Sequence, residues 1–471
     1  MAEANGLEKP NGVNGAGSGN GGHHPGYTGR FLISFEPGTA EKAVGLLKDK
    51  AGVNALNARD AGAESASSEN MVFEEIGAAV VSALPDQHRA LMAAVADSSV
   101  PITLVERERV VWAAMLSNPV AHVSKGVSLL PPSRRDTLDG PVVAPPTLPT
   151  PGLLSADFLR GYTAALRGLL AGLDGGISPS LDVPRELGAA AASATWGLQV
   201  TRVPLSAQSG HGIRVAVLDT GMDLHHPDFS GRTVVSRSFI PGEAVQDGHG
   251  HGTHCIGVSC GPRNPAGTQR YGVAYGAEIY AGKVLSNQGS GADGGILAGI
   301  NWAVQNKCQI VSMSLGSPVD VGEPFSQTYQ NAARIAEQKG TLIVAAAGNE
   351  SNRPGSIAPV GHPANCPTIV AVAAIDLALQ VARFSCGGVN GDGGEVNLAA
   401  PGVDVFSSWP MPLRYNTISG TSMATPCVAG IMALYAEATG LRGLALANFV
   451  LKKSQRLSPT RDFGWGLVQA G

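Results

Sequence analysis

The sequence predicts an α/β domain with a mostly parallel sheet and helices on both faces, preceded by a small α+β domain of ferredoxin-like type. Short, nearly unbroken apolar runs in the second half of the chain are typical of strands buried on both faces. Helix candidates lie between these runs, as expected when strands and helices alternate. The apolar runs are 213–219, 310–316, 341–349 and 368–374, and the helix candidates are 294–306 and 325–340.

Residues 27–113 show a different alternation of predicted strands and helices. Their order, β-α-β-β-α-β, suits a small ferredoxin-like unit. The strand candidates are 30–36, 71–76, 78–84 and 101–114, and the helix candidates are 39–50 and 86–96. We therefore divide the chain into a disordered leader (1–26), this small domain (27–113), a connector (114–195) and the α/β domain (196–471).

The connector combines two features. Its segment PVVAPPTLPTPG (141–152) is Pro-rich, which is typical of a semi-rigid linker. The following segment (155–176) places its apolar residues on one helical face and ends at two glycines. We expect this helix to pack on a neighbouring part of the protein and not to anchor it in a membrane.

The composition excludes several classes of protein. The 471 residues carry a net charge of -4, so no general basic surface favours nucleic acid, and no apolar run of about 18 residues predicts a membrane span. The leader lacks the apolar segment of a signal peptide, so the chain as given is predicted to be cytoplasmic, with secretion as the alternative. Six cysteines without a CxxC pair predict mostly buried thiols, with one or two disulfides as the alternative.

Polar residues stand at or near the ends of the apolar runs. Asp219 ends the first run and Asn349 the third. Ser422 begins a long helix candidate, in which Pro426 is expected to fall in the first turn, where a missing amide is tolerated. Because the carboxyl ends of parallel strands share one edge of a sheet, we expect reactive side chains to gather there.

Acyl transfer needs a hydroxyl nucleophile, a base that reaches it, an acid that orients the base, and donors for the developing oxyanion. Ser422 at a helix N-terminus supplies a nucleophile next to free backbone N–H groups. His251 supplies a base and Asp219 an orienting acid, in the chain order Asp, His, Ser.

Four motifs now resemble those of subtilisin-like serine peptidases, the subtilases. They are VAVLDTGMDLHHPDF, HGTHCIG, AAAGNE and SGTSMATPCVAG, in the family's order over about 210 residues. The resemblance covers roughly residues 196–471. It implies that Asp219 is the orienting acid, His251 the general base and Ser422 the nucleophile. It also implies that Asn349 donates to the oxyanion together with the Ser422 backbone N–H.

The stretch DGHGHGTHCIG (247–257) holds three histidines, and zinc binding is the alternative to catalysis. His251 and His254 have an i,i+3 spacing, but the Glu of an HExxH helix and a clear third ligand are missing. In the family's register the first histidine of HGTH is catalytic. We therefore expect His254 to be a hydrogen-bonded structural residue and His249 to lie at the rim.

The resemblance also implies a substrate cleft in which the peptide adds as a strand between two segments. Small residues on the far side would leave room for a large apolar side chain in the first specificity pocket, with Glu350 near its rim weakly favouring basic residues. Where the family often has a large aromatic, this chain has Asp293, which predicts a less apolar distal pocket that tolerates a basic or polar residue four positions before the cut; helix capping is the alternative role. The implied segments and pocket residues are Ser314, Leu315 and Gly316; Gly289, Ser290 and Gly291; and Ala346, Ala347, Gly348 and Gly361.

Two further expectations follow from the resemblance. No cofactor is required, but structural calcium is common in the family, and Asp228 matches one ligand position. Cys255 lies four residues after His251, one helical turn below the base, where some subtilases carry a buried free cysteine. Sensitivity to mercurials is therefore expected, with a disulfide to Cys427 as the alternative.

The predicted function is that of a serine endopeptidase acting on protein or peptide substrates through an acyl-enzyme. Residues 27–113 resemble an inhibitory propeptide, so the chain's own N-terminal unit is an expected partner and the chain a self-inhibited precursor. The connector departs from this pattern, because a usual propeptide runs directly into the mature chain. The alternatives are a catalytically silent peptide-binding module and a metallohydrolase built on the histidines.

Overall fold

A computed structural model describes residues 26–60, 70–97, 100–114, 193–391 and 393–471. The predicted connector helix lies outside these residues, as does the leader apart from residue 26. Within the described part of the chain, no helix is long and apolar enough to cross a membrane.

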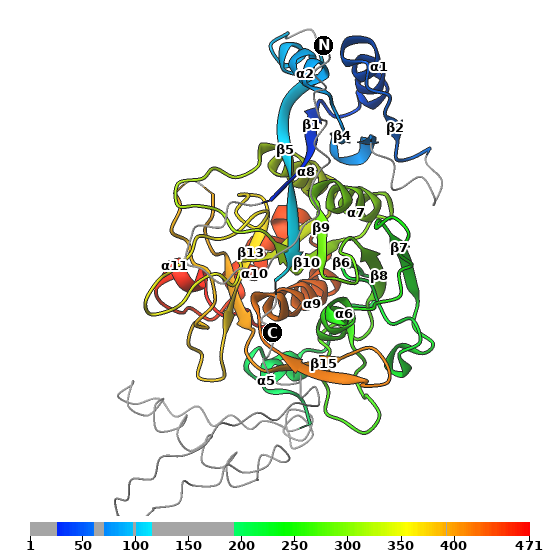
Figure 1. The fold of residues 1–471 in the computed structure, drawn as a ribbon. Helices are drawn as coiled ribbons and strands as arrows, with labels where there is room; N and C mark the ends of the chain where they lie inside the picture. The colour runs from blue at the N-terminus through cyan, green and yellow to red at the C-terminus, as the bar shows by residue number, and fades with distance from the viewer. Residues whose placement is uncertain (1–25, 61–69, 98–99, 115–192, 392) are drawn as a thin grey trace, which may run out of the picture. The chain divides into compact units, whose positions relative to one another are not determined.

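A seven-stranded parallel sheet forms the centre of the α/β domain (Figure 1). The four apolar runs predicted as strands form β6, β10, β12 and β13, and every strand pair in this sheet is parallel, which confirms the predicted fold class. In spatial order the strands are β14 (Leu398–Pro401), β13 (Val370–Ile375), β12 (Leu342–Ala346), β10 (Ile310–Met313), β6 (Arg214–Asp219), β8 (Glu278–Lys283) and β7 (Val234–Ser238).

Helices cover both faces of this sheet. Alternate residues of β6 enter two different cores: Val215 and Val217 pack with the helices α6 (His251–Cys260) and α9 (Thr421–Thr439). Ala216 and Leu218 pack on the opposite side with α7 (Asp293–Gln305) and α8 (Gln327–Gln338). Because both faces are buried, the strands need no polar alternation, which explains the unbroken apolar runs.

The remaining elements of this domain surround the sheet. Two short strands line the cleft, β9 (Ser290–Ala292) and β11 (Leu315–Gly316), and a hairpin joins β15 (Val405–Ser408) to β16 (Tyr415–Ile418). Three further helices are α5 (Trp196–Val200), α10 (Gly443–Lys453) and α11 (Thr460–Phe463).

The N-terminal unit follows the predicted order of elements, with one additional short strand. Its sheet runs β5-β1-β4-β3-β2, and the predicted strand 71–76 ends at Phe73, because a 3-10 turn occupies Glu74–Ile76. The elements are β1 (Tyr27–Phe35), α1 (Ala40–Ala51), β2 (Leu56–Asn57), β3 (Met71–Phe73), β4 (Ala78–Val81), α2 (Pro85–Val95) and β5 (Ile102–Ala113).

The sheet of the N-terminal unit is also covered on both faces. Ile33 and Val81 pack in a core with α1 and α2. Their neighbours Leu32 and Val80 point to the other face and join the core that contains α7 and α8 of the α/β domain. The long strand β5 extends beyond this sheet into the α/β domain and pairs there with β9 and β11 (Figure 1). The N-terminal unit therefore contacts the α/β domain through a sheet face and one extended strand.

Candidate active site

A buried Asp–His pair lies at the carboxyl edge of the parallel sheet. Asp219 is the last residue of β6 and His251 the first residue of α6, and neither is exposed. Nδ1 of His251 lies 2.7 Å from Oδ1 of Asp219, which also accepts the backbone N–H of Thr220 at 2.7 Å. Because a carboxylate only accepts hydrogen bonds, Nδ1 carries the hydrogen, and Nε2 of the neutral ring is left as a proton acceptor.

The carboxylate also determines the basicity of the histidine. Burial by itself lowers the pKa of His251, but the neighbouring Asp219 and Cys255 together outweigh this effect, so that the pKa lies well above its ordinary value. Nε2 of His251 has no hydrogen-bond partner among the residues that the structure describes. The ring therefore combines raised proton affinity with an unoccupied nitrogen.

Ser422 is the second residue of α9 and is fully buried. Its Oγ lies 3.1 Å from the backbone oxygen of Ser314 and also contacts the backbone oxygen of Ala114, the residue that follows the N-terminal unit. The thiol of Cys255 lies between base and nucleophile, with Sγ 3.9 Å from His251 Nδ1 and 3.6 Å from the Ser422 carbonyl oxygen.

Pro426 is the sixth residue of α9 and not a first-turn residue, so that expectation was wrong. In a regular helix its N–H would donate to the carbonyl of Ser422, and proline has no N–H. The Ser422 carbonyl is instead satisfied from outside the helix, by the hydroxyl of Ser314 at 2.8 Å and by the thiol of Cys255. Because Pro426 has no N–H, the Ser422 carbonyl is free to accept hydrogen bonds from Ser314 and Cys255, and these bonds hold the start of α9.

Asn349 follows β12 and is oriented from one side. Its Oδ1 accepts the backbone N–H and the hydroxyl of Thr421, each at 2.9 Å. Its Nδ2 is buried and has no partner in the described part of the chain. A buried amide donor is costly to leave unpaired, so its occurrence beside the start of α9 indicates a position where a negative oxygen can be bound.

The strand β5 fills the cleft in an antiparallel manner between the two predicted segments. Trp112 pairs with Ser290 of β9 and with Gly316 of β11. Beyond these pairs, the N–H of Ala113 donates to the Gly289 oxygen at 2.9 Å, and the N–H of Ala114 to the Ser314 oxygen at 3.1 Å. The structure therefore brings both predicted segments against one extended strand, and the carbonyl of the residue that follows it, Ala114, contacts Ser422.

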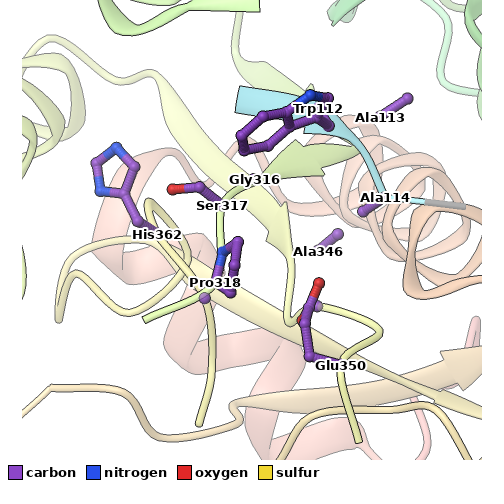
Figure 2. A pocket seen from close by; sticks show the side chains of 11 residues that line it. Trp112, Ala113, Ala114, Gly316, Ser317, Pro318, Ala346, Glu350 and His362 are labelled. Atoms are coloured by element: carbon purple, nitrogen blue, oxygen red, sulfur yellow. The ribbon is translucent and has the colours of Figure 1, made fainter. Parts of the chain in front are cut away.

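A cavity of about 240 Å³ opens beside Ala114 (Figure 2). In Figure 2, Glu350 and His362 stand on opposite sides of the cavity. Glu350 Oε2 accepts a hydrogen bond from the thiol of Cys386 at 3.1 Å. The predicted pocket residues that line the cavity are Gly316, Ala346, Gly348, Glu350 and Gly361. Apart from Glu350 these are glycines and an alanine, and their small size gives the cavity its room.

Asp293 does not lie where the distal-pocket hypothesis placed it. Its Oδ2 accepts the backbone N–H of Arg109 at 2.8 Å. Arg109 is the sixth residue when the residues are counted back from Ala114 as the first. The other oxygen of Asp293, Oδ1, lies 2.9 Å from His362 Nε2. The fourth position is Val111, which is fully buried in an apolar core that also contains Leu315. Asp293 is also the first residue of α7, where an acidic side chain is favourable. The geometry thus contradicts a basic-residue pocket at the fourth position.

The other two histidines have separate environments. Burial, and then the charge of His251, lower the pKa of His254 to about 3, so it is neutral at neutral pH, and its Nε2 lies 3.0 Å from the Val405 oxygen. Its predicted structural role is confirmed. His249 is half-buried, with its ring centroid 6.2 Å from that of His251. Among the described residues, the one group with metal-ligand spacing is Asp219, His251 and Cys255, which does not include His254 and so does not support the His251–His254 zinc pair.

The carboxylate of the predicted calcium ligand Asp228 is hydrogen-bonded by other side chains. Its carboxylate accepts from Tyr271 at 2.6 Å, Arg414 at 2.9 Å and Tyr415 at 3.0 Å. Burial raises the pKa of Asp228, but these three donors outweigh burial and hold that pKa below its ordinary value. A guanidinium in contact with the carboxylate does not fit a calcium ligand. All six cysteines are free, so neither the pair Cys255–Cys427 nor another disulfide forms.

One positioning residue was missed from the sequence. Asp247 accepts the backbone N–H groups of His249, Gly250 and Thr253 at 2.8–3.0 Å, and so holds the turn from which α6 begins. Its Oδ1 also accepts the hydroxyl of Thr220. An Asp before a glycine-rich turn and a helix is a capping signal that could have identified it.

Comparison with known proteins shows which protein family this chain resembles. The profile of the subtilase family matches residues 210–466. Subtilisin Savinase of Lederbergia lenta is 39% identical over 285 residues, which cover 59% of this chain and 98% of that protein. M-protease of Shouchella clausii (strain KSM-K16) is 38% identical over 285 residues, covering 59% and 70%. Subtilisin E of Bacillus subtilis (strain 168) is 39% identical over 249 residues, covering 52% and 61%.

These similarities define the class of protein as a serine endopeptidase. The profile covers more than half of the sequence and includes the strands and helices that carry Asp219, His251 and Ser422. The chain belongs to the subtilase family.

Proposed function

We propose that this protein hydrolyses peptide bonds in proteins and peptides through Ser422, His251 and Asp219. The Ser422 hydroxyl attacks the carbonyl carbon as His251 Nε2 takes its proton, and the Asp219 carboxylate stabilises the imidazolium. The oxyanion is bound by Asn349 Nδ2 and the Ser422 backbone N–H. His251 then returns the proton to the leaving amine, and water cleaves the acyl-enzyme by the same steps in reverse.

One observation carries this proposal: a peptide carbonyl already contacts the nucleophile. The Ala114 carbonyl oxygen is in contact with Ser422 Oγ, while Nε2 of His251 and Nδ2 of Asn349 have no partners among the described residues. These two vacant groups are those that the first step would use. A silent peptide-binding module would need the strand-pairing walls but not these two groups.

We further propose that the chain is a precursor inhibited by its own N-terminal unit, and that it cleaves the bond that follows Ala114. The strand β5 occupies the cleft, and two of its carboxylates bind helix starts in the catalytic domain. Glu108 accepts the N–H of Gly294 in α7 at 2.9 Å, and Glu106 accepts the N–H groups of Gln327 and Thr328 in α8 at 3.0 and 3.1 Å. Helix N-termini favour negative charge, so these contacts stabilise β5 in the cleft. They therefore support the proposal that the N-terminal unit inhibits the enzyme.

A fluorophosphonate probe tests both parts of this proposal. The wild-type full chain should mature to a fragment that begins at Met115, and the mature protein should be labelled by the probe with or without a chelator. Ser422→Ala should remain unprocessed and unlabelled. A wild type that is neither processed nor labelled would favour the peptide-binding module, and peptide hydrolysis that a chelator abolishes, without labelling by the probe, would favour the metallohydrolase.

A further inference from the structure

Two carboxylates of the catalytic domain hold Arg109 of β5, the sixth residue counted back from Ala114 in the cleft. Asp293 Oδ2 accepts the backbone N–H of Arg109 at 2.8 Å, and Glu323 Oε1 accepts its guanidinium Nη2 at 2.7 Å. The side chains of this ion pair are 12% and 21% exposed. One carboxylate thus binds the backbone of the sixth residue, and the other binds its side-chain charge.

Each carboxylate is held by the catalytic domain through its other oxygen. Asp293 Oδ1 lies 2.9 Å from Nε2 of His362, and the pair is buried. Glu323 Oε2 accepts the backbone N–H of Asp320 at 2.9 Å. Because neither carboxylate depends on Arg109 for its position, the site is preorganised for a ligand, which lowers the entropy lost on binding.

The two carboxylates continue the two walls of the cleft. Asp293 follows β9 directly, and Glu323 lies on the loop between β11 and α8. β9 and β11 are the strands that pair with β5. A peptide bound in the same register would therefore bring its own sixth residue between the two carboxylates after the N-terminal unit has left.

We propose that Asp293 and Glu323 form a subsite for a basic side chain, Arg or Lys, six residues before the cleaved bond of protein substrates. This inference rests on the proposed function, since it uses the register in which Ala114 contacts Ser422. Asp293 binds the backbone amide of any residue, so the preference for charge comes from Glu323. A partly covered ion pair predicts a preference of about three- to tenfold in kcat/KM, which decreases as salt screens it.

The experiment uses the full chain after maturation and fluorogenic peptides that copy residues 109–114, with Arg, Lys, Ala or Glu at the sixth position. Active enzyme is counted with the fluorophosphonate probe. The variants are Glu323→Gln, Glu323→Lys and the control Asp320→Asn. Asp320 is an exposed residue of the same loop whose described hydrogen bonds involve its backbone groups. The control therefore removes a nearby charge without changing the contact to Arg109.

The wild type should cleave the Arg and Lys peptides about three- to tenfold better than the Ala peptide, and the Glu peptide least well. Glu323→Gln should remove the difference between Arg and Ala, Glu323→Lys should favour Glu, and Asp320→Asn should keep the wild-type order. Equal kcat/KM for Arg and Ala in the wild type would overturn the subsite, as would an Arg preference that survives in Glu323→Gln. Failure of the proposed function is different: no peptide would be cleaved and no enzyme labelled.

Discussion

His251 binds the Asp219 carboxylate through Nδ1 at 2.7 Å, while its Nε2 has no partner among the described residues. The two nitrogens of one ring are therefore assigned to different tasks by their surroundings. The carboxylate selects the tautomer, and the same contact raises the affinity of the ring for a proton.

The pH dependence of hydrolysis should reflect this pair. Burial lowers the pKa of His251, but Asp219 and Cys255 together raise it by more, so the acid limb of kcat/KM should lie above pH 6.5, because the base must be neutral to accept a proton. Asp219→Asn removes the charge that stabilises the imidazolium. We expect kcat to fall about 10⁴-fold and the acid limb to move to lower pH. Profiles of kcat/KM against pH for the wild type and Asp219→Asn test this expectation. An acid limb that moves to higher pH in the variant would contradict the role of Asp219 in raising the pKa of His251.

Removal of the Asn349 donor should slow the chemical step without weakening substrate binding. Nδ2 is the vacant group, whereas Oδ1 is bound by Thr421. We expect Asn349→Ala to lower kcat about 10²–10³-fold with little change in KM, the range associated with losing such a donor in subtilisin itself. Steady-state kinetics on one peptide measure both constants. A large rise in KM with unchanged kcat would show that Asn349 binds the ground state instead.

Mercurials should inhibit the mature enzyme through Cys255. Its thiol lies between His251 and the Ser422 carbonyl, so a bulky metal on sulfur would displace both. Burial raises the pKa of Cys255, which keeps the sulfur a neutral thiol at neutral pH. Cys255→Ala should retain activity and become resistant, while Cys427→Ala should remain sensitive. Full wild-type activity in excess mercurial would disprove this role.

Asp228 should stabilise the fold through Arg414 and two tyrosines without calcium. Asp228→Asn leaves the guanidinium without its partner, so we expect a loss of about 2 kcal/mol in the free energy of unfolding at neutral pH. Because the folded pKa of Asp228 is lowered, its contribution is complete above an unfolded pKa of about 4 and is lost as pH falls through the folded value. Denaturant unfolding of wild type and variant measures it. A difference that vanishes when calcium is chelated would instead make Asp228 a calcium ligand.

The sequence by itself was sufficient to predict a parallel sheet, four of its seven strands and the polar residues at or near their ends. Unbroken apolar runs and the polar residues behind them are local patterns, and each run predicted as a strand forms one. Asp219 and Asn349 could be singled out because chemistry at the edge of a parallel sheet follows from strand direction alone.

Only the tertiary structure decided which distant groups meet these residues. Asp228 looked like a metal ligand until Arg414, 186 positions away, was found on its carboxylate. Asp293 looked like part of a fourth-position pocket until the register of β5 placed Arg109 opposite it, and nothing local in the sequence links Glu323 to the cleft. Periodicity reports which side of an element is buried, whereas the partner of a charged group depends on register and loop packing between segments far apart in the chain.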